Sequence, residues 1–214
     1  IRVATAAKMA SLVSEPAVAR MLSAYKIDRV SACTYTCPNA TARALLVEAA
    51  SPADAFGVFS MLAPHAGCTL RPDVSLRSVQ QSGKTLIVTA WQGKTWLRFD
   101  CTLEDADAGA KACERLIDRT VFSLVAANPP LLMQAVRDVK TESCESWLVR
   151  SATLLTRLDQ PTLRQLDASA VNDRLGLTGE ATLSVVAIKQ TADSPTLVVW
   201  MAEYPTAEAA KAAA

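Results

Sequence analysis

The six cysteines are the residues of this 214-residue chain whose type could do chemistry, and their number is even. They are Cys33, Cys37, Cys68, Cys101, Cys113 and Cys144. The sequence has neither the C-x-x-C pair of thioredoxin-like redox proteins nor the C-x-x-C-H motif of covalent haem attachment. Six cysteines are many for a cytosolic protein of this size, whereas disulfides persist in exported proteins. The count therefore favours an exported protein with disulfides.

One disulfide can be predicted from the path of the chain. Cys33 and Cys37 lie in a strand-like run, which places them on one face about 13 Å apart. Cα atoms must lie within about 7 Å for a disulfide, so these two should not bond each other. A second strand and a returning helix would bring Cys68 back to Cys37, and we predict the Cys37–Cys68 pair. Cys33 and Cys101 are the other disulfide candidates. The alternative is that most of the cysteines, Cys113 and Cys144 in particular, are buried free thiols.

Catalytic and metal-binding patterns are weak. The chain has one His, which excludes any scheme that needs two. His65 and Cys68 have the His-x-x-Cys spacing of half a zinc site. They could also act as a Cys nucleophile and its base, but the sequence completes neither pattern. Gly-x-Ser-x-Gly and phosphate-binding glycine loops do not occur. We therefore predict no catalytic residue, no metal and no cofactor, and interpret the protein as not an enzyme. An enzyme using Cys68 and His65 is the weaker rival.

Composition and charge narrow the class of protein further. Half of the residues are hydrophobic, and 22 Lys and Arg face 21 Asp and Glu. This balance offers no basis for a nucleic-acid partner. No run of about 18 uncharged apolar residues is present, so we predict no membrane-spanning segment. The chain starts at Ile1 and not at Met, so we expect any export signal or lipid anchor to lie upstream of Ile1.

The residue pattern repeats a strand–strand–helix order. Residues 29–37 and 42–50 read as a hairpin, followed by a helix that Ser51 caps and Pro52 begins. Residues 84–91 and 95–103 form a second hairpin with a helix over 105–126. Two more hairpins are predicted, at 146–150 with 153–158 and at 181–190 with 196–204. Such units predict an α+β fold, a two-layer sandwich of antiparallel sheet with helices on one face.

The repeats also suggest how the chain divides. We expect an N-terminal helical segment over 1–24 and two α+β halves over 25–126 and 127–214. The two halves are either pseudo-equivalent units or parts of one continuous domain.

Trp91 and Trp96 flank the tight turn of the second hairpin. That position predicts that they pair across the two strands on one face of the sheet. They either pack in the core or form an aromatic surface for a partner, because Trp is enriched in interface hot spots.

Four segments in this order carry a resemblance to a known family. They are residues 46–60 with the Ser51-Pro52 helix start, 88–97 with the Trp-x-Gly-Lys turn, 128–132 with Asn-Pro-Pro, and 145–151. The chain resembles an uncharacterised bacterial domain family of unknown function, found on exported proteins and lipoproteins. The resemblance implies a periplasmic or otherwise extracytoplasmic bacterial setting.

These observations favour a non-catalytic, extracytoplasmic protein-interaction domain. It would be an accessory or structural subunit of a larger, membrane-associated assembly, docking through an aromatic sheet face or an edge strand. The alternative is a small-ligand-binding module with a pocket between sheet and helices.

Overall fold

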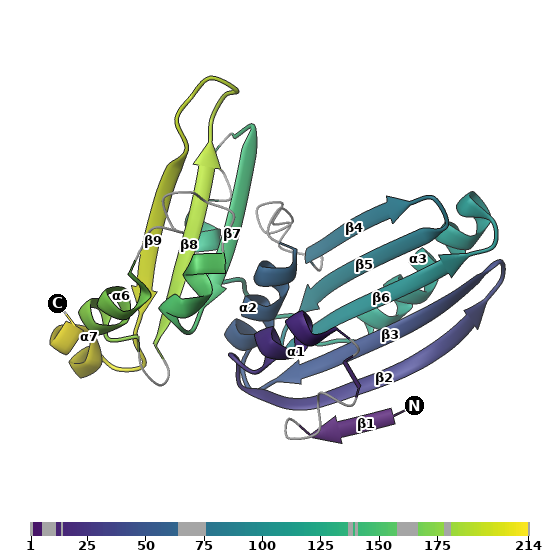
Figure 1. Ribbon diagram of the computed structural model, residues 1–214, viewed down its shortest axis with the longest axis horizontal. Helices are drawn as coiled ribbons and strands as arrows, with labels where there is room; N and C mark the ends of the chain where they lie inside the picture. Colours follow the sequence, from purple (N-terminus) through teal and green to yellow (C-terminus); the bar gives the residue numbers. More distant parts are fainter. Residues whose placement is uncertain are drawn as a thin grey trace.

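The fold consists of two antiparallel sheets with helices packed around them (Figure 1). A computed structural model describes residues 2–5, 12–13, 15–63, 76–136, 139, 141–157, 167–177 and 181–213. The larger sheet has the order β1-β2-β3-β6-β5-β4, and the smaller has the order β7-β8-β9. The strands are β1 (Arg2–Thr5), β2 (Ile27–Cys37), β3 (Ala40–Ala49), β4 (Leu76–Ser82), β5 (Thr85–Gln92), β6 (Thr95–Leu103), β7 (Ser143–Val149), β8 (Thr182–Lys189) and β9 (Leu197–Glu203). The predicted α+β class with antiparallel sheets is confirmed.

Three of the described helices start at a residue whose side chain caps the helix. The described helices are α1 (Pro16–Leu22), α2 (Pro52–Leu62), α3 (Ala106–Phe122), α4 (Leu131–Val136), the 3₁₀ helix η3 (Ala152–Arg157), α6 (Ala168–Leu175) and α7 (Ala207–Ala213). The Ser51 hydroxyl accepts the backbone N–H of Asp54 at 3.1 Å, and Pro52 is the first residue of α2. The Asp105 carboxylate accepts two backbone N–H groups at the start of α3. Both starts agree with the predicted helices, because side-chain acceptors replace the partners that the first turn lacks.

Helices cover both faces of the larger sheet. On one face, α3 buries Cys113 and Ile117 against Leu97 and Phe99 of β6. The neighbouring Trp96 points to the opposite face, where it joins the core built with α2. Figure 1 shows α1 in front of this sheet and α3 behind it. The sequence led us to expect helices on one face only. Because the start of β6 is apolar on both faces, each of them needs a helical cover.

Helix α2 connects the two sheets. It contacts β3, β5 and β6 on one side and β7 on the other. Ser60 of α2 accepts the backbone N–H of Leu148 at 3.0 Å, and the Tyr25 hydroxyl donates to the Leu148 carbonyl at 2.7 Å. These two bonds cover the outer edge of β7. One apolar core therefore runs from the larger sheet through α2 into the smaller sheet.

The expected division of the chain can be placed on this fold. The boundary at 126/127 falls between α3 and α4, outside both sheets. In the first half, β3 pairs with β6, which is the second strand of the β5–β6 hairpin. In the second half, β7 pairs with β8, which is the first strand of the β8–β9 hairpin. Within the expected N-terminal helical segment, Arg2–Thr5 is a strand, because its backbone pairs with the open edge of β2. The helix of that segment is α1.

The predicted strand at 153–158 is wrong, since the structure has η3 there. Hydroxyl groups bond the local backbone: the Thr153 N–H donates to the Ser151 Oγ at 3.3 Å, and Thr156 donates to the Thr153 carbonyl at 2.9 Å. Such bonds compete with a sheet ladder. The partner of β7 is instead β8, which arrives more than 30 residues later.

Candidate functional site

The tryptophan pair is part of the core. Trp91 and Trp96 lie directly opposite each other, so the predicted cross-strand pairing is confirmed. Their exposed fractions are only 4% and 0%. The Phe56 ring of α2 meets Trp91 edge-on, with centroids 5.4 Å apart. Helix α2 therefore covers both side chains, and of the two alternatives for this pair the structure has the packing in the core.

The predicted cysteine pairing also differs. Cys33, Cys37, Cys101 and Cys113 are free thiols, and Cys144 on β7 is disulfide-bonded. Because Cys37 is a free thiol, the predicted Cys37–Cys68 disulfide is not supported. Cys68 and His65 lie outside the described residues. Within the described ranges, no group of three His, Cys, Asp or Glu residues could hold a metal ion.

Three of the free thiols, Cys37, Cys101 and Cys113, belong to the apolar core between α3 and the larger sheet. Gly109 permits the close approach, since a Cβ there would lie 2.5 Å from the Asn39 carbonyl oxygen. Cys113 lies one turn further on the same side of the helix and is buried in the same apolar core as Cys101, with Cys37 packed against that core. Burial raises the pKa of Cys37 and of Cys101 above the usual range of a thiol. Cys37 and Cys101 are therefore protonated at neutral pH, and neither is a thiolate nucleophile there.

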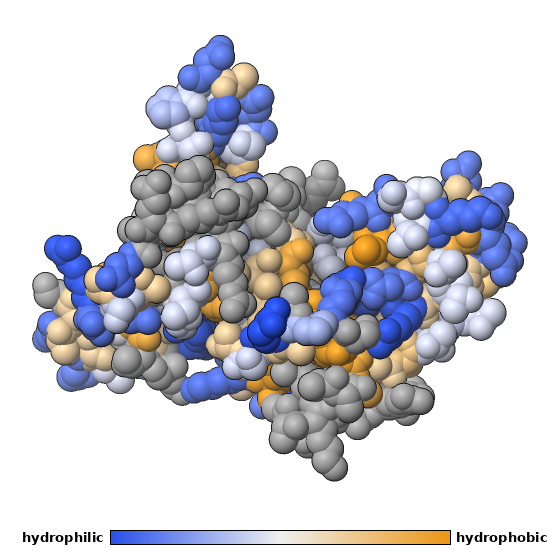
Figure 2. All heavy atoms as spheres, in the orientation of Figure 1, coloured by the Kyte–Doolittle hydropathy of each residue, from blue (hydrophilic) through white to orange (hydrophobic). Residues whose placement is uncertain are grey.

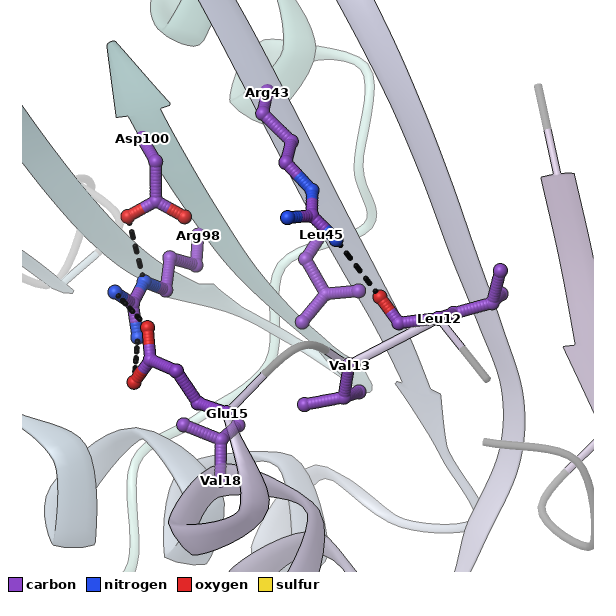
Figure 3. Close-up of a pocket in the computed structure, with 8 residues that line it drawn as sticks. All are labelled: Leu12, Val13, Glu15, Val18, Arg43, Leu45, Arg98 and Asp100. Atoms are coloured by element: carbon purple, nitrogen blue, oxygen red, sulfur yellow. Dashed lines mark hydrogen bonds and ion pairs between the residues drawn. The ribbon is translucent and has the colours of Figure 1, made fainter. Parts of the chain in front are cut away.

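The face of the larger sheet beside α1 carries charged residues that neutralise one another (Figure 3). Arg98 donates to Asp100 at 2.9 Å and to Glu15 at 2.8 Å, and Arg43 donates to the Leu12 carbonyl at 3.1 Å. Figure 2 shows hydrophilic side chains gathered on the larger sheet next to α1. The pocket between them has a volume of about 20 Å³, which is room for about one water molecule. It is too small for an organic ligand.

A larger cavity lies at the end of the larger sheet, beneath the segment that leaves α3. Its volume is about 470 Å³, within the size range of small-molecule sites. Its walls combine apolar residues of this segment with the strand ends and the first residue of α2. They include Leu124, Val125, Ala49, Pro52, Asp28 and Lys94. The sequence showed no motif for this cavity, because it forms only when the segment after α3 passes the turn at Gly93.

The edges of the two sheets differ in how they are protected against further pairing. Strand β4 carries Arg77, Gln80 and Gln81, and the edge of β7 is covered by Ser60 and Tyr25. Strand β9 is the outer strand of the smaller sheet, and Leu197–Ala202 contains no charged residue. Proteins that stay monomeric normally place charges, prolines or covering elements on such edges. Of the edge strands β4, β7 and β9, β9 is therefore the one most able to accept another strand.

Two side chains of β9 extend this apolar surface into solvent. Leu197 is 59% exposed, and Trp200 is 36% exposed. The sequence pattern could have identified this strand, since Leu-Val-Val-Trp-Met-Ala is an uncharged run of residues that favour strands. Its position at the edge could not be seen from the pattern, because it depends on β8 lying between β7 and β9.

No protein-family model, curated protein or solved structure matches this chain. The resemblance to an exported bacterial domain family thus stays a prediction. None of the described helices is long and apolar enough to span a membrane.

Proposed function

We propose that the protein is a non-catalytic protein-interaction domain that docks an extended segment of a partner protein along β9. The open edge of β9, which is uncharged over Leu197–Ala202, is the single observation that carries this proposal. An added antiparallel strand would pair its backbone with the free N–H and C=O groups of the edge. Leu197 and Trp200 supply apolar contacts beside that ladder, and a central Trp is a frequent interface anchor.

The setting of this docking is part of the same proposal. We place the domain outside the cytoplasm of a bacterium, as an accessory or structural subunit of a larger, membrane-associated assembly. The high cysteine count and the disulfide-bonded Cys144 support an oxidising compartment. The family resemblance supports the bacterial, exported setting.

Site-specific photo-cross-linking tests the docking edge in cells that naturally produce the protein. Benzoylphenylalanine replaces Trp200 in one variant and Val79 in a control variant. Val79 is a matched control, because it is an apolar residue of the edge strand β4 and is 51% exposed. We expect one discrete adduct from position 200 and none from position 79. Adding Leu197→Lys should reduce the adduct, since a charge on the edge opposes strand addition.

The absence of an adduct at position 200, or equal adducts at both positions, would contradict the proposal. An adduct between two copies of the chain would identify the partner as a second copy.

The cavity beneath the segment after α3 favours a second candidate, a small-ligand-binding module. Its volume of about 470 Å³ and its mixed apolar and charged walls suit a small amphipathic molecule. Ligand-observed NMR with a library of such molecules tests this candidate. We expect binding that Leu124→Trp abolishes, because the indole fills the cavity, and that Trp200→Lys leaves unchanged. Binding that survives Leu124→Trp would contradict it.

A further inference from the structure

The end of α3 and the segment after it carry the most exposed large apolar side chains of the described residues. Phe122, the last residue of α3, is 88% exposed, and Val125 is 86% exposed. Leu131, the first residue of α4, is 60% exposed. We call these three residues the α3 tip. The range 120–136 that contains them has no charged residue, and the β9 docking proposal makes no use of it.

We propose that the α3 tip inserts into the surface of a lipid bilayer that contains anionic lipids. Several exposed apolar side chains gathered on one segment mark a contact with a protein or a membrane. Side chains as exposed as Phe122 and Val125 have few neighbours, so they protrude and do not form the closely packed patch of a protein interface. Lipid chains adapt around a protruding apolar group, and such a contact needs no matching shape.

The backbone beside the α3 tip is suited to an environment that is poor in water. Ser123 and Leu124 donate their backbone N–H groups to carbonyls of the preceding turn, at 3.2 and 3.0 Å. The Ser123 hydroxyl donates to the Thr120 carbonyl at 2.6 Å. Pro129 and Pro130 have no N–H group. Unpaired backbone groups are costly in a bilayer, so these features favour insertion.

Exposed basic residues lie where the lipid headgroups would be. Arg119 lies three residues before Phe122, on the same side of α3 and about 4.5 Å back along its axis. The headgroup layer is about 6 Å thick, so it would reach Arg119. Arg115 lies about 10 Å back, close to the screening distance of physiological salt. Lys94 lines the same cavity as Val125.

The carboxylates of this region leave a surplus of one positive charge. Two of them are held in ion pairs, Glu48 by Arg29 and Asp118 by Arg77. Asp28 on the cavity wall and Glu114 on α3 then stand against the three basic residues. One positive charge near an anionic surface favours binding by about fivefold. The charges therefore complement an anionic bilayer, and the apolar side chains supply most of the affinity.

Vesicle flotation of the purified full chain tests the contact. The vesicles contain phosphatidylcholine alone, or equal parts of phosphatidylcholine and phosphatidylglycerol. We expect a partition coefficient about fivefold higher for the mixed vesicles, and Arg119→Gln should remove this preference. The double variant Phe122→Ser with Val125→Ser should bind the mixed vesicles about tenfold more weakly or less still, because it loses the buried apolar area.

The matched control is the double variant Tyr35→Ser with Val79→Ser. It also removes one aromatic residue and one Val that are exposed, but these belong to β2 and β4. It should float as the wild type does.

Vesicles of brominated phosphatidylcholine and phosphatidylglycerol report insertion directly, since bromine on the acyl chains quenches indole fluorescence. The indole introduced by Phe122→Trp should be quenched, and the indole introduced by Val79→Trp should not. Phe122→Trp keeps a large apolar side chain, so this measurement tests the same contact even if the Ser variants are unstable.

A wild type that floats with neither vesicle would overturn the proposal, as would equal flotation of the two double variants. An unquenched indole at position 122 would overturn the insertion. Benzoylphenylalanine at position 122 that forms a discrete protein adduct in the producing cells would also overturn it, because a protein would then cover the α3 tip. None of these variants changes β9, so this proposal and the docking proposal can fail independently.

Discussion

Replacing Arg150 by Met should loosen the joint between the two sheets. Arg150 follows β7, and its guanidinium donates to both carboxylate oxygens of Asp54 in α2, at 2.9 and 3.0 Å. Asp54 is 1% exposed, and the Arg150 side chain is 12% exposed. The Asp54 carboxylate also accepts from the Ser51 hydroxyl at 2.6 Å and from the Lys26 N–H at 3.3 Å. The Met variant leaves these two neutral donors and removes the positive charge.

The magnitude follows from the burial of the pair. Removing one partner of a buried ion pair leaves an uncompensated charge and costs about 3–5 kcal/mol. For a chain of this length, that loss should lower the midpoint of thermal unfolding by roughly 10 °C. The double variant Asp54→Leu with Arg150→Met should recover most of the loss, because a well-packed apolar pair can replace a buried ion pair.

Urea unfolding followed by tryptophan fluorescence measures these differences, since tryptophans lie in both sheets. Arg29→Met is the control, because Arg29 pairs with Glu48 in an ion pair that is open to solvent and should contribute nothing measurable. A loss below about 1 kcal/mol in Arg150→Met, or a double variant no more stable than the single one, would refute the reasoning.

Two further predictions concern the packing of Tyr25 against α2. Tyr25→Phe should cost about 1–3 kcal/mol at pH 8, because the buried Leu148 carbonyl loses its donor. Burial raises the pKa of Tyr25, so the folded protein keeps a proton that the unfolded chain releases near pH 10. The wild type should therefore lose about 1 kcal/mol more than the variant between pH 10 and pH 11, and a constant gap in urea titrations would contradict this. Gly57→Ala should cost about 1–3 kcal/mol, since its Cβ would lie 2.1 Å from a Tyr25 ring carbon. In a Tyr25→Leu background, calorimetry should show a smaller cost, and an unchanged cost would exclude the clash.

The features that could be predicted from the sequence depend on neighbours along the chain. The Ser51 cap and the Asp105 helix start are bonds within one turn, so residue type and spacing reveal them. The pairing of Trp91 with Trp96 follows from a tight turn, which sets the register of its two strands. The α+β class follows from these local units and their order.

The tertiary structure decided which of these surfaces are covered and which are open. The Trp pair is buried because α2 returns over it, and Cys113 is buried because α3 packs on the larger sheet. Strand β9 is an open edge because β8 pairs with β7 on its other side. Strands β7 and β8 are separated by more than 30 residues of sequence. Local hydrogen bonds and turn geometry are set by a few adjacent residues. The covering of a face or an edge depends on contacts between distant segments, and the apolar pattern of one segment does not say which partner will bury it.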